Sequence, residues 1–584
     1  MKNLHSNPFL KAKAGAWRKL RYAFLSLMIA SWAVLAIAAS HWLDSDGVSY
    51  VNIATAVMHG NWQAAVNRYW SPGYPVLFSF WLRVFKPSTY NLIASVRWFD
   101  LLWLIVALVS FEWLLRTVMK ALEKRATADS ESTLSPGPFK ALGYVLFFWV
   151  TCYLTPPSVN PPDIFVFIAL LLAATISLRI AEGSERWLDY AALGIVLGLG
   201  YLAKAAMFPL SFVFFGAVAL AVRNRRMAPR LLAALLVFLL VSGPFVLALS
   251  RKQGHPSFGS TGAINYAIAV DYVQPYGYWR GGKPGNGTPI HPIRQLMDTP
   301  PVYEYAMPNG GTLPIWLHHG YWYDGVRPHV ILKRQVSVIH ISLDEYFKML
   351  GVPLSPLLAG IFFLVLVEGR IPTFGRRFLK ELVLWAPAVA GFAMYALVHV
   401  EARFLSGFVI LLWAAACLSL RLPAWAAGKN VGRSVAWSVI ILLGLQIGLA
   451  VGHSASRVIS GNPFPSWQTA VKLKQAGVEP GDKVCYLGDP VDDDVWALLS
   501  GVQIVCNVPR ADVLNFWAAS EADKRRIVRA FENAGAKAAV GTYVPTAETE
   551  SGWAQAGRLT VLIRLGGRHP LQFTPTVPLV GTPH

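Results

Sequence analysis

Long apolar runs, separated by short polar segments, dominate the chain. The runs continue for about 20 residues, the length of a helix that crosses a bilayer. They do not show the alternation of apolar and polar positions that membrane β-strands require. The pattern therefore predicts a polytopic α-helical membrane protein with about eleven spans. The expected spans are residues 22–40, 89–116, 139–155, 163–180, 188–204, 205–222, 231–249, 346–367, 381–398, 404–420 and 434–452.

The charges of the loops predict the orientation of these spans. Lys and Arg gather before the first span and in every second loop after it, whereas the short loops around 156–162 and 399–403 contain only Arg403. Because cytoplasmic loops carry the excess of basic residues, we expect the N-terminus in the cytoplasm. The expected location is a bacterial-type inner (plasma) membrane. Three segments then lie outside: 41–88, 250–345 and 453–584.

Composition agrees with a membrane protein and excludes other classes. Charged residues make up 14% of the chain, against about 25% in soluble proteins. The 22 Trp and four Cys argue against a disordered chain and against a disulfide scaffold. A net charge of +20 would suggest nucleic acid in a soluble protein. Here the basic residues lie mainly between apolar runs, so we interpret them as orientation signals and expect no nucleic-acid partner.

The three outer segments differ in character. Segment 41–88 predicts an interfacial helix, a break at Gly60-Asn61-Trp62, and a second amphipathic helix that starts near Ser71-Pro72. Segment 250–345 is rich in Tyr, Trp, Gly and Pro and has little helical period. We interpret it as a large irregular loop that covers a site at the membrane face.

The tail has the composition of a separate domain. Short apolar strands alternate there with helices, which predicts a small extracytoplasmic α/β accessory domain at 453–584 after a membrane domain at 1–452. Cys485 and Cys506 fall on two neighbouring expected strands, and a disulfide could join them if the tail lies outside. The aspartates at 489 and 492–494 could be read as a metal cluster, but we interpret them as a loop that caps the helix starting at Val495.

Two carboxylates follow the first span at the outer face. Asp44 and Asp46 precede the first interfacial helix, on which Tyr50, Ile53 and Ala54 recur at helical spacing. Asp46 could simply cap a helix that begins at Gly47. A helix N-terminus would also favour the ionised form of Asp46, which a general base requires.

This loop resembles a known family. Its motifs are Asp46-x-x-x-Tyr50-x-x-Ile53-Ala54, Gly60-Asn61-Trp62 and Tyr69-Trp70-Ser71-Pro72. They resemble the first external loop of GT-C glycosyltransferases, above all the branch of protein O-mannosyltransferases and lipid A aminoarabinose transferases. Asp46 stands at the position of that family's catalytic Asp. Gly47 replaces the second acid, and Asp44 restores a D-x-D form. Ser71 stands where many relatives have Lys or His.

Three later segments extend the resemblance over most of residues 20–420. Pro161-Pro162-Asp163 is similar to the family's second acidic site. Gly198-Leu-Gly-Tyr-Leu-Ala-Lys204 resembles its G-x-L-x-K segment, and His399-Val-Glu401-Ala-Arg403-Phe404 resembles the H-x-E-x-R-Y segment of bacterial members. Arg97 is a weaker match at the outer start of the second span.

The resemblance implies an inverting glycosyltransferase, a hexosyl- or pentosyltransferase, at the outer membrane face. It would move a sugar from a polyprenyl-phosphate carrier to a cell-envelope acceptor: lipid A or lipopolysaccharide, a glycan, or a protein. The implied catalytic residues are Asp46 and Asp44. The implied ligands of the donor phosphate are Lys204, Arg403 and Arg97. The implied acidic or orienting residues are Asp163, Glu401, His399 and Tyr50. No cofactor is certain; a divalent metal, if present, would bind Asp44 and Asp46.

Simpler interpretations and other functions stay open. Lys204 could extend to the interface without binding a ligand, Arg403 could only pair with Glu401 or orient its span, and Asp163 could cap a helix. A secondary transporter would show internal repeats and polar residues near the bilayer midplane; we find no repeat. A polysaccharide ligase or polymerase would need Arg and His of the middle loop and would not need Asp46.

Overall fold

The computed structural model describes most of the chain. The described residues are 8–128, 136–158, 162–222, 225–273, 287, 291, 293–305, 310–317, 325–423, 425–426, 429–461, 464–491, 493–543, 553–556 and 560–565. Pro161 and Asp492, which belong to two of the motifs above, lie outside these residues.

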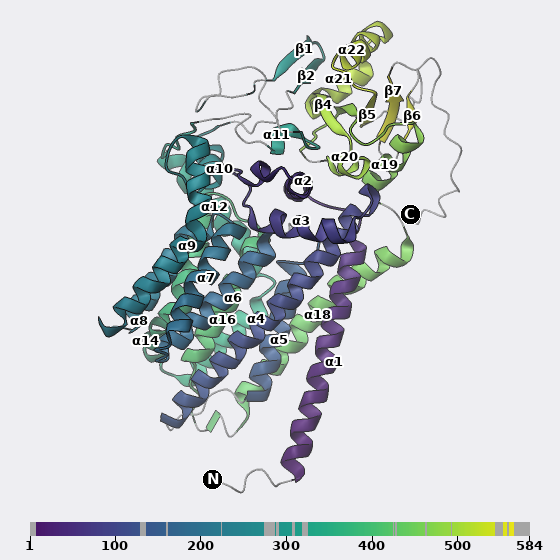
Figure 1. Cartoon of the computed structure of the whole chain (residues 1–584). Coiled ribbons are helices and arrows are strands. Elements are labelled where there is room, and N and C mark those ends of the chain that lie inside the picture. The colour runs from purple at the N-terminus through teal and green to yellow at the C-terminus, as the bar shows by residue number, and fades with distance from the viewer. Residues whose placement is uncertain are drawn as a thin grey trace.

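A bundle of apolar helices forms the larger part of the molecule (Figure 1). Its members are α1 (Pro8–Ala38), α4 (Leu92–Ala128), α5 (Pro136–Tyr153), α6 (Pro162–Ala181), α7 (Trp187–Ala203), α8 (Met207–Val222), α9 (Ala228–Gln253), α12 (Leu332–Tyr346), α13 (Ser355–Glu368), α14 (Ile371–Lys380), α15 (Leu382–Ala396), α16 (Ser406–Ser419) and α18 (Val431–Ser460). The apolar stretch of α6 is 78% buried, the highest share among the long helices of the described chain, because α4, α7 and α16 pack around it. The second acidic motif therefore begins a central helix.

Each of the eleven expected spans coincides with a helix of this bundle. Within the described residues, five helices are long and apolar enough to cross a membrane, or seven if two bent helix pairs count as one span each. The bends are 84° before α13 and 88° between α14 and α15. Three further apolar helices, α7, α8 and α16, have 17, 16 and 14 residues. The multi-pass character is confirmed, and the count of eleven stays a prediction.

The first outer segment forms a layer across one end of the bundle (Figure 1). It consists of α2 (Ser45–Met58), η1 (Trp62–Ala65), α3 (Gly73–Phe85) and η2 (Thr89–Asn91), which confirms two helices with a break after Met58. Tyr50 and Val57 of α2 and Tyr74 and Phe78 of α3 belong to one buried apolar cluster. The pairing of the two helices therefore fixes the N-terminus of α2 against the bundle.

A seven-stranded sheet lies above this layer. The tail supplies β3 (Lys483–Leu487), β4 (Gln503–Val508), β5 (Ala538–Thr542), β6 (Ala554–Gln555) and β7 (Thr560–Arg564), together with α19 (Pro465–Gln475), α20 (Val495–Ser500), α21 (Val513–Ala518) and α22 (Glu521–Asn533). The order is β1-β2-β4-β3-β5-β7-β6, with β3 parallel to β4 and β5. The α/β character is confirmed. A disulfide joins Cys485 on β3 to Cys506 on β4.

The middle outer segment is more regular than the sequence predicts. It contains α10 (Thr261–Val270), β1 (Arg294–Asp298), β2 (Pro301–Glu304) and α11 (Pro314–Leu317). Strand β2 pairs antiparallel with β4, with Tyr303 opposite Asn507. The expectation of an irregular loop was wrong here because these short strands pair with a strand about 200 residues later, which no local pattern reveals.

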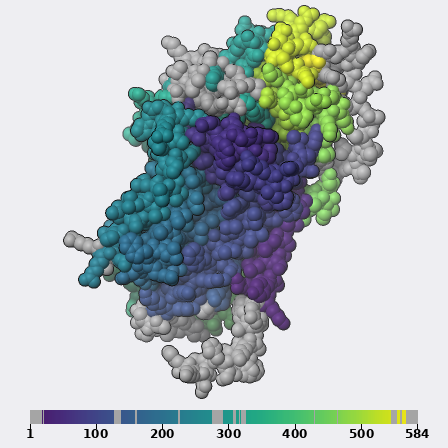
Figure 2. All heavy atoms as spheres, viewed as in Figure 1, coloured from purple at the N-terminus to yellow at the C-terminus, as the bar shows by residue number. Residues whose placement is uncertain are grey.

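The outer layer packs against both the bundle and the sheet. Figure 2 shows the first outer segment, in purple, between the teal bundle helices and the green and yellow sheet region. Its buried cluster includes Ala470 of α19 and Leu499 of α20. The tail therefore packs against helices α2 and α3.

Candidate active site

The N-terminus of α2 carries the two predicted carboxylates. Asp44 is the N-cap residue, and its side chain accepts a hydrogen bond from the Gly47 N–H at 2.8 Å. The helix begins at Ser45, so the alternative that Asp46 only caps a helix starting at Gly47 does not hold. Asp46 lies in the first turn, where the helix dipole favours a negative charge. Its carboxylate is therefore left for contacts with other parts of the chain.

Arg403 connects these carboxylates to two further acidic residues. It lies on η7 (Ala402–Phe404), the short turn before α16. Its guanidinium nitrogens lie 3.2 Å from Asp44 and 2.8 Å from Asp46. They also lie 2.6 Å from Glu401 and 3.5 Å from Asp163. A planar guanidinium with five donors can hold several carboxylates at once, so three distant segments meet at one side chain.

Lys204 completes this arrangement from the break between α7 and α8. Its Nζ lies 2.6 Å from Asp163 and 3.8 Å from the centre of the Phe404 ring. Asp163 is 2% exposed and lies between Lys204 and Arg403. We call the set of six residues the Arg403 cluster; its members are Asp44, Asp46, Asp163, Lys204, Glu401 and Arg403. The Asp163 contacts exceed those of a simple helix cap.

Ser71 has a role that the sequence does not reveal. Its hydroxyl accepts a hydrogen bond from the Ala205 N–H at 3.1 Å, directly after Lys204. Gly73 lies so close to the end of α7 that a Cβ there would be 2.8 Å from the Leu202 carbonyl oxygen. The start of α3 therefore holds the backbone turn that carries Lys204. Ser71 positions this turn.

Acids outnumber bases in the cluster, with four carboxylates against two cations. Burial and the neighbouring Asp46 charge raise the pKa of Asp44 to about 6, although Arg403 acts in the opposite direction. Burial also raises the pKa of Glu401, but the hydrogen bond to His399 and the Arg403 charge outweigh it and lower the pKa to about 2. Asp44 is therefore the member of this pair that takes up a proton near neutral pH.

His399 and Tyr50 lie at the edges of the cluster. The His399 Nε2 is 3.1 Å from a Glu401 oxygen, and the side chain is 65% exposed, so it lies on the outer rim. Tyr50 is buried, with its ring packed edge-on against Trp70 and Tyr74. Burial, and then the Asp46 charge, raise the pKa of Tyr50 well above its ordinary value. Its phenol therefore stays neutral beside Asp46.

Arg97 lies near Asp44, and its charge acts to lower the pKa of that carboxyl, but its described contacts are with other groups. Its side chain is 1% exposed and pairs with Asp100 at 3.3 Å. It also donates to the carbonyl oxygens of Ala39 and Trp42, at 3.3 and 2.5 Å. These contacts fasten the end of α1 to α4. The structure does not bring Arg97 together with Lys204 and Arg403, so its geometry does not support a contact with a donor phosphate.

The tail contacts the N-terminus of α2 through Val491 and Asp494. The hydroxyl of Ser45, between the two predicted acids, donates to the Val491 carbonyl and lies 3.4 Å from an Asp494 oxygen. Asp494 is 1% exposed, and its second oxygen has no hydrogen-bond partner within the described chain. Burial and the Asp493 charge raise the pKa of Asp494 well above its ordinary range. Asp494 is the N-cap residue of α20, as the capping interpretation expects, but its side chain makes no cap bond to the helix.

The predicted metal ligands do not form a metal site. Asp44 and Asp46 both bind the Arg403 guanidinium. Among the residues that the structure describes, no three His, Cys, Asp or Glu side chains are grouped so that they could hold a metal ion. Two carboxylates already paired with one guanidinium are an incomplete donor set for a divalent cation.

The helical bundle, the interfacial helices and the outer sheet together give the chain a fold similar to that of ArnT. The crystal structure of ArnT from Cupriavidus metallidurans in the apo state is similar over 94% of this chain and 98% of that chain, with 15% identity and a TM-score of 0.52. ArnT from the same organism bound to undecaprenyl phosphate covers 93% of this chain and 98% of its own, with 14% identity and a TM-score of 0.53.

Other comparisons add little to this fold assignment. The Archaeoglobus fulgidus oligosaccharyltransferase complex with Zn and sulfate is 13% identical and covers 88% of this chain and 67% of its own, at a TM-score of 0.42. No protein-family model matches the chain. No curated protein sequence matches it either. The similarity therefore lies in the fold, and the activity has to be argued from the site.

Proposed function

We propose that the chain is an inverting glycosyltransferase that moves a sugar from a polyprenyl-phosphate carrier to a cell-envelope acceptor. The observation that carries the proposal is the Arg403 cluster itself. In it, a carboxylate at a helix N-terminus, Asp46, lies within 2.8 Å of a guanidinium that shares Asp163 with a lysine. A base and two phosphate-binding cations are the groups that this transfer requires.

The proposed reaction assigns one role to each group. Asp46 accepts the proton of the acceptor hydroxyl as the oxygen attacks the anomeric carbon from the face opposite the phosphate. The bond between that carbon and the phosphate oxygen breaks, and the carrier leaves as a phosphate monoester. The phosphate gains one negative charge in this step, which Lys204 and Arg403 stabilise. No general acid is needed because the phosphate is a good leaving group.

The choice of carrier is supported by the fold. ArnT, which shares the fold over nearly the whole chain, has been crystallised with undecaprenyl phosphate. In the unliganded chain the two cations are neutralised by Asp163 and Glu401. A donor phosphate therefore has to compete with these carboxylates, and proton uptake by Asp44 would lower the cost of the added negative charge.

Several features support a site at the outer face of the inner membrane. The N-terminal end of α1 and the sheet lie at opposite ends of the bundle (Figure 1). Basic residues gather on the side of the N-terminus. The disulfide between Cys485 and Cys506 suits an oxidising compartment. We therefore place the N-terminus in the cytoplasm and residues 453–584, as an accessory domain, outside.

The decisive experiment uses purified protein in lipid nanodiscs with polyprenyl-phosphate-linked hexoses and pentoses. Envelope extracts serve as acceptors, and mass spectrometry detects the products. Asp46→Asn keeps the shape of the side chain and cannot accept the proton, so transfer should fall by about 10²–10⁴-fold. Donor binding and thermal stability should persist. Near-wild-type turnover of Asp46→Asn would remove Asp46 from the mechanism, and no transfer by the wild type with any donor would reject the proposal.

A further inference from the structure

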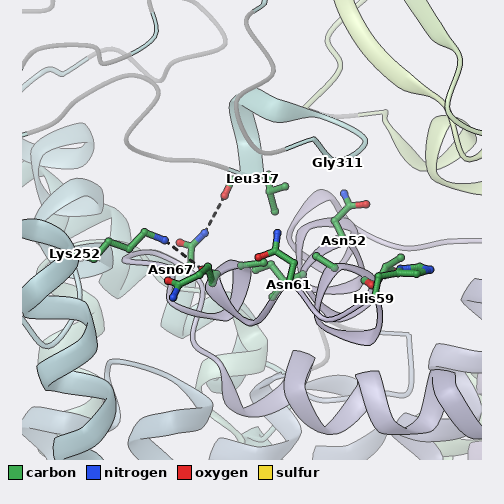
Figure 3. A pocket seen from close by; sticks show the side chains of 12 residues that line it. Asn52, His59, Asn61, Asn67, Lys252, Gly311 and Leu317 are labelled. Carbon is green, nitrogen blue, oxygen red and sulfur yellow. Dashed lines mark hydrogen bonds between the residues drawn. The ribbon is translucent and has the colours of Figure 1, made fainter.

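A cavity lined by both apolar side chains and amides lies on the face of α2 that points away from Asp46. Its volume is about 340 Å³, within the range of pockets that hold small molecules (~300–1,000 Å³). Figure 3 shows its side chains, with Lys252 at one side, His59 at the other and Leu317 above. The lining residues are Asn52, Ile53, Thr55, Ala56, His59, Asn61, Gln63, Ala64, Asn67, Lys252, Gly311 and Leu317. None of them belongs to the Arg403 cluster.

The framework of the cavity is held by internal hydrogen bonds. Asn67 donates to the Leu317 carbonyl at 3.1 Å and accepts from the N–H groups of Tyr69 and Trp70. The Lys252 Nζ donates to the carbonyl oxygens of Gln63 and Val66, at 3.3 and 2.6 Å. Three separate parts of the chain, α9, the segment after η1 and the middle outer segment, are thereby fixed around one space.

Other polar groups of the lining are left for a ligand. The Thr312 hydroxyl donates to the Asn52 Oδ1 at 3.1 Å. The Asn52 Nδ2 has no hydrogen-bond partner within the described chain. The side chains of Asn61 and Gln63 have no hydrogen-bond partner there either and are exposed. The His59 Nδ1 is taken by the Thr55 carbonyl, which leaves Nε2. Each amide offers donors and acceptors side by side, which matches neighbouring hydroxyl groups.

The charge of the cavity lining favours a neutral ligand over a strongly anionic one. Lys252 is the one Lys or Arg of the lining, and its ammonium is already used by two carbonyl oxygens. A phosphate group would need free cations or bidentate guanidinium groups. Peptides, in turn, bind by adding a strand to a sheet edge or by placing apolar anchors in a groove. The lining combines small apolar residues, such as Ala56 and Ala64, with neutral amides, which suits an uncharged polyhydroxyl compound.

The distance from Asp46 sets the length of the ligand. Asn52 and His59 lie six and thirteen positions after Asp46 on or at the end of α2, which is about 9 and 20 Å along the helix axis. Asn52 also lies about 120° around the helix from Asp46. One sugar ring cannot fill the cavity and present a hydroxyl to Asp46, so the ligand must be a chain of several units.

We infer that this cavity binds the remote sugars of a neutral oligosaccharide or polysaccharide, and that this glycan is the acceptor. The inference rests on the proposed function for the reaction, whereas binding of the glycan can be measured without any transfer. Gly311 forms part of the wall, and its φ of +88° favours glycine at this position.

The test measures binding by saturation-transfer NMR and by isothermal titration on the full-length protein in nanodiscs. The probes are oligosaccharides released by mild acid from the host envelope, separated into neutral and anionic fractions, together with a pool of extended peptides. The neutral fraction should bind the wild type. The double variant Asn61→Ala and Gln63→Ala should bind it about tenfold more weakly, because two ligand hydrogen bonds are lost. Gln475→Ala, an exposed amide on α19, should bind as the wild type does.

Each other outcome has a definite meaning. Preferential binding of the anionic fraction or of peptides, or an unchanged affinity of the double variant, would overturn the inference. If transfer from the lipid donor proceeds while neutral glycans do not bind, the inference fails and the proposed function stands. If neutral glycans bind at Asn61 and Gln63 but no donor is ever consumed, the cavity is a glycan site and the proposed function fails.

Discussion

Ser45 and Asp494 are 449 positions apart in the sequence, yet the Ser45 hydroxyl lies 3.4 Å from an Asp494 carboxylate oxygen. Ser45 stands between Asp44 and Asp46, so the tail contacts the backbone that carries both acids. The same hydroxyl donates to the Val491 carbonyl. The tail therefore helps to set the positions of the two carboxylates, beyond the accessory role that its composition suggests.

Removal of this contact should lower turnover more than donor affinity. Asp494→Ala takes away the buried acceptor near Ser45, so the two acids should lose part of their alignment, and kcat should fall by about tenfold with little change in the KM for the donor. Initial-rate kinetics with a lipid-linked donor provide the measurement. Glu479→Ala, an exposed acid of the same domain, is the control and should leave both constants unchanged. A change confined to thermal stability would reduce Asp494 to a packing role.

Neutral replacements of the two cations should weaken donor binding. Arg403→Gln and Lys204→Met remove the charges that face the proposed phosphate, so the KM for the donor should rise by about tenfold or more and kcat should fall as well. Lys204→Met leaves the buried Asp163 with only the more distant Arg403 as a cation. The double variant Lys204→Met and Asp163→Asn removes both charges and separates misfolding from loss of binding. Arg251→Gln, at the exposed end of α9, is the control, and unchanged donor kinetics in both single variants would contradict the assignment.

Donor affinity should decrease as the pH rises through about 6. Asp44, whose pKa is raised to about 6, is neutral below this pH and negative above it, so its charge then opposes an anionic phosphate. Titration with a phosphodiester analogue, whose single charge is constant over this range, at pH 5–8 measures the effect. Asp44→Asn should flatten the profile because no carboxylate remains to ionise. The opposite slope, or the same slope in the variant, would show that another group governs binding.

Arg97 should prove to be a stabilising residue. Arg97→Met leaves Asp100 buried without its partner and frees the carbonyl oxygens of Ala39 and Trp42. Such a loss typically costs about 3–5 kcal/mol, so the apparent Tm in detergent should fall clearly. The protein that remains folded should keep the wild-type KM for the donor. A raised KM with an unchanged Tm would restore the phosphate contact that the sequence match suggests.

Local patterns predicted much of the bundle and part of the site. Apolar runs located the helices, and the order of motifs placed Asp46, Asp163, Lys204 and Arg403 at the same membrane face, where the structure brings them together. The alternative that Asp46 caps the helix placed the N-cap two residues late, because Ser45, Asp46 and Gly47 are all acceptable in a first turn. Arg97 matched the family motif by position. Its hydrogen bonds to backbone carbonyl oxygens could not be predicted from the sequence.

The features that could not be predicted from the sequence depend on long-range contacts. The pairing of β2 with β4 and the contact between Ser45 and Asp494 each join segments hundreds of residues apart. A single sequence contains no signal for such pairs, since hydrophobic periodicity reports only which face of an element is buried. Ser71 shows the same limit: its contact with Ala205 depends on how α3 packs against α7.

The shared sheet has a consequence for how the protein is made. Strand β2 leaves the ribosome about 200 residues before β4, its partner. Several helices are synthesised between the two strands. During this time the edge of the β1–β2 hairpin that later binds β4 is unpaired, and an unpaired strand edge is prone to wrong pairing. In the proposed orientation, the sheet can close only after the last span has inserted and the tail has crossed the membrane. Assembly of the site would then be a final event of biogenesis, and an incompletely translocated chain would carry its acids and cations without the support of Asp494.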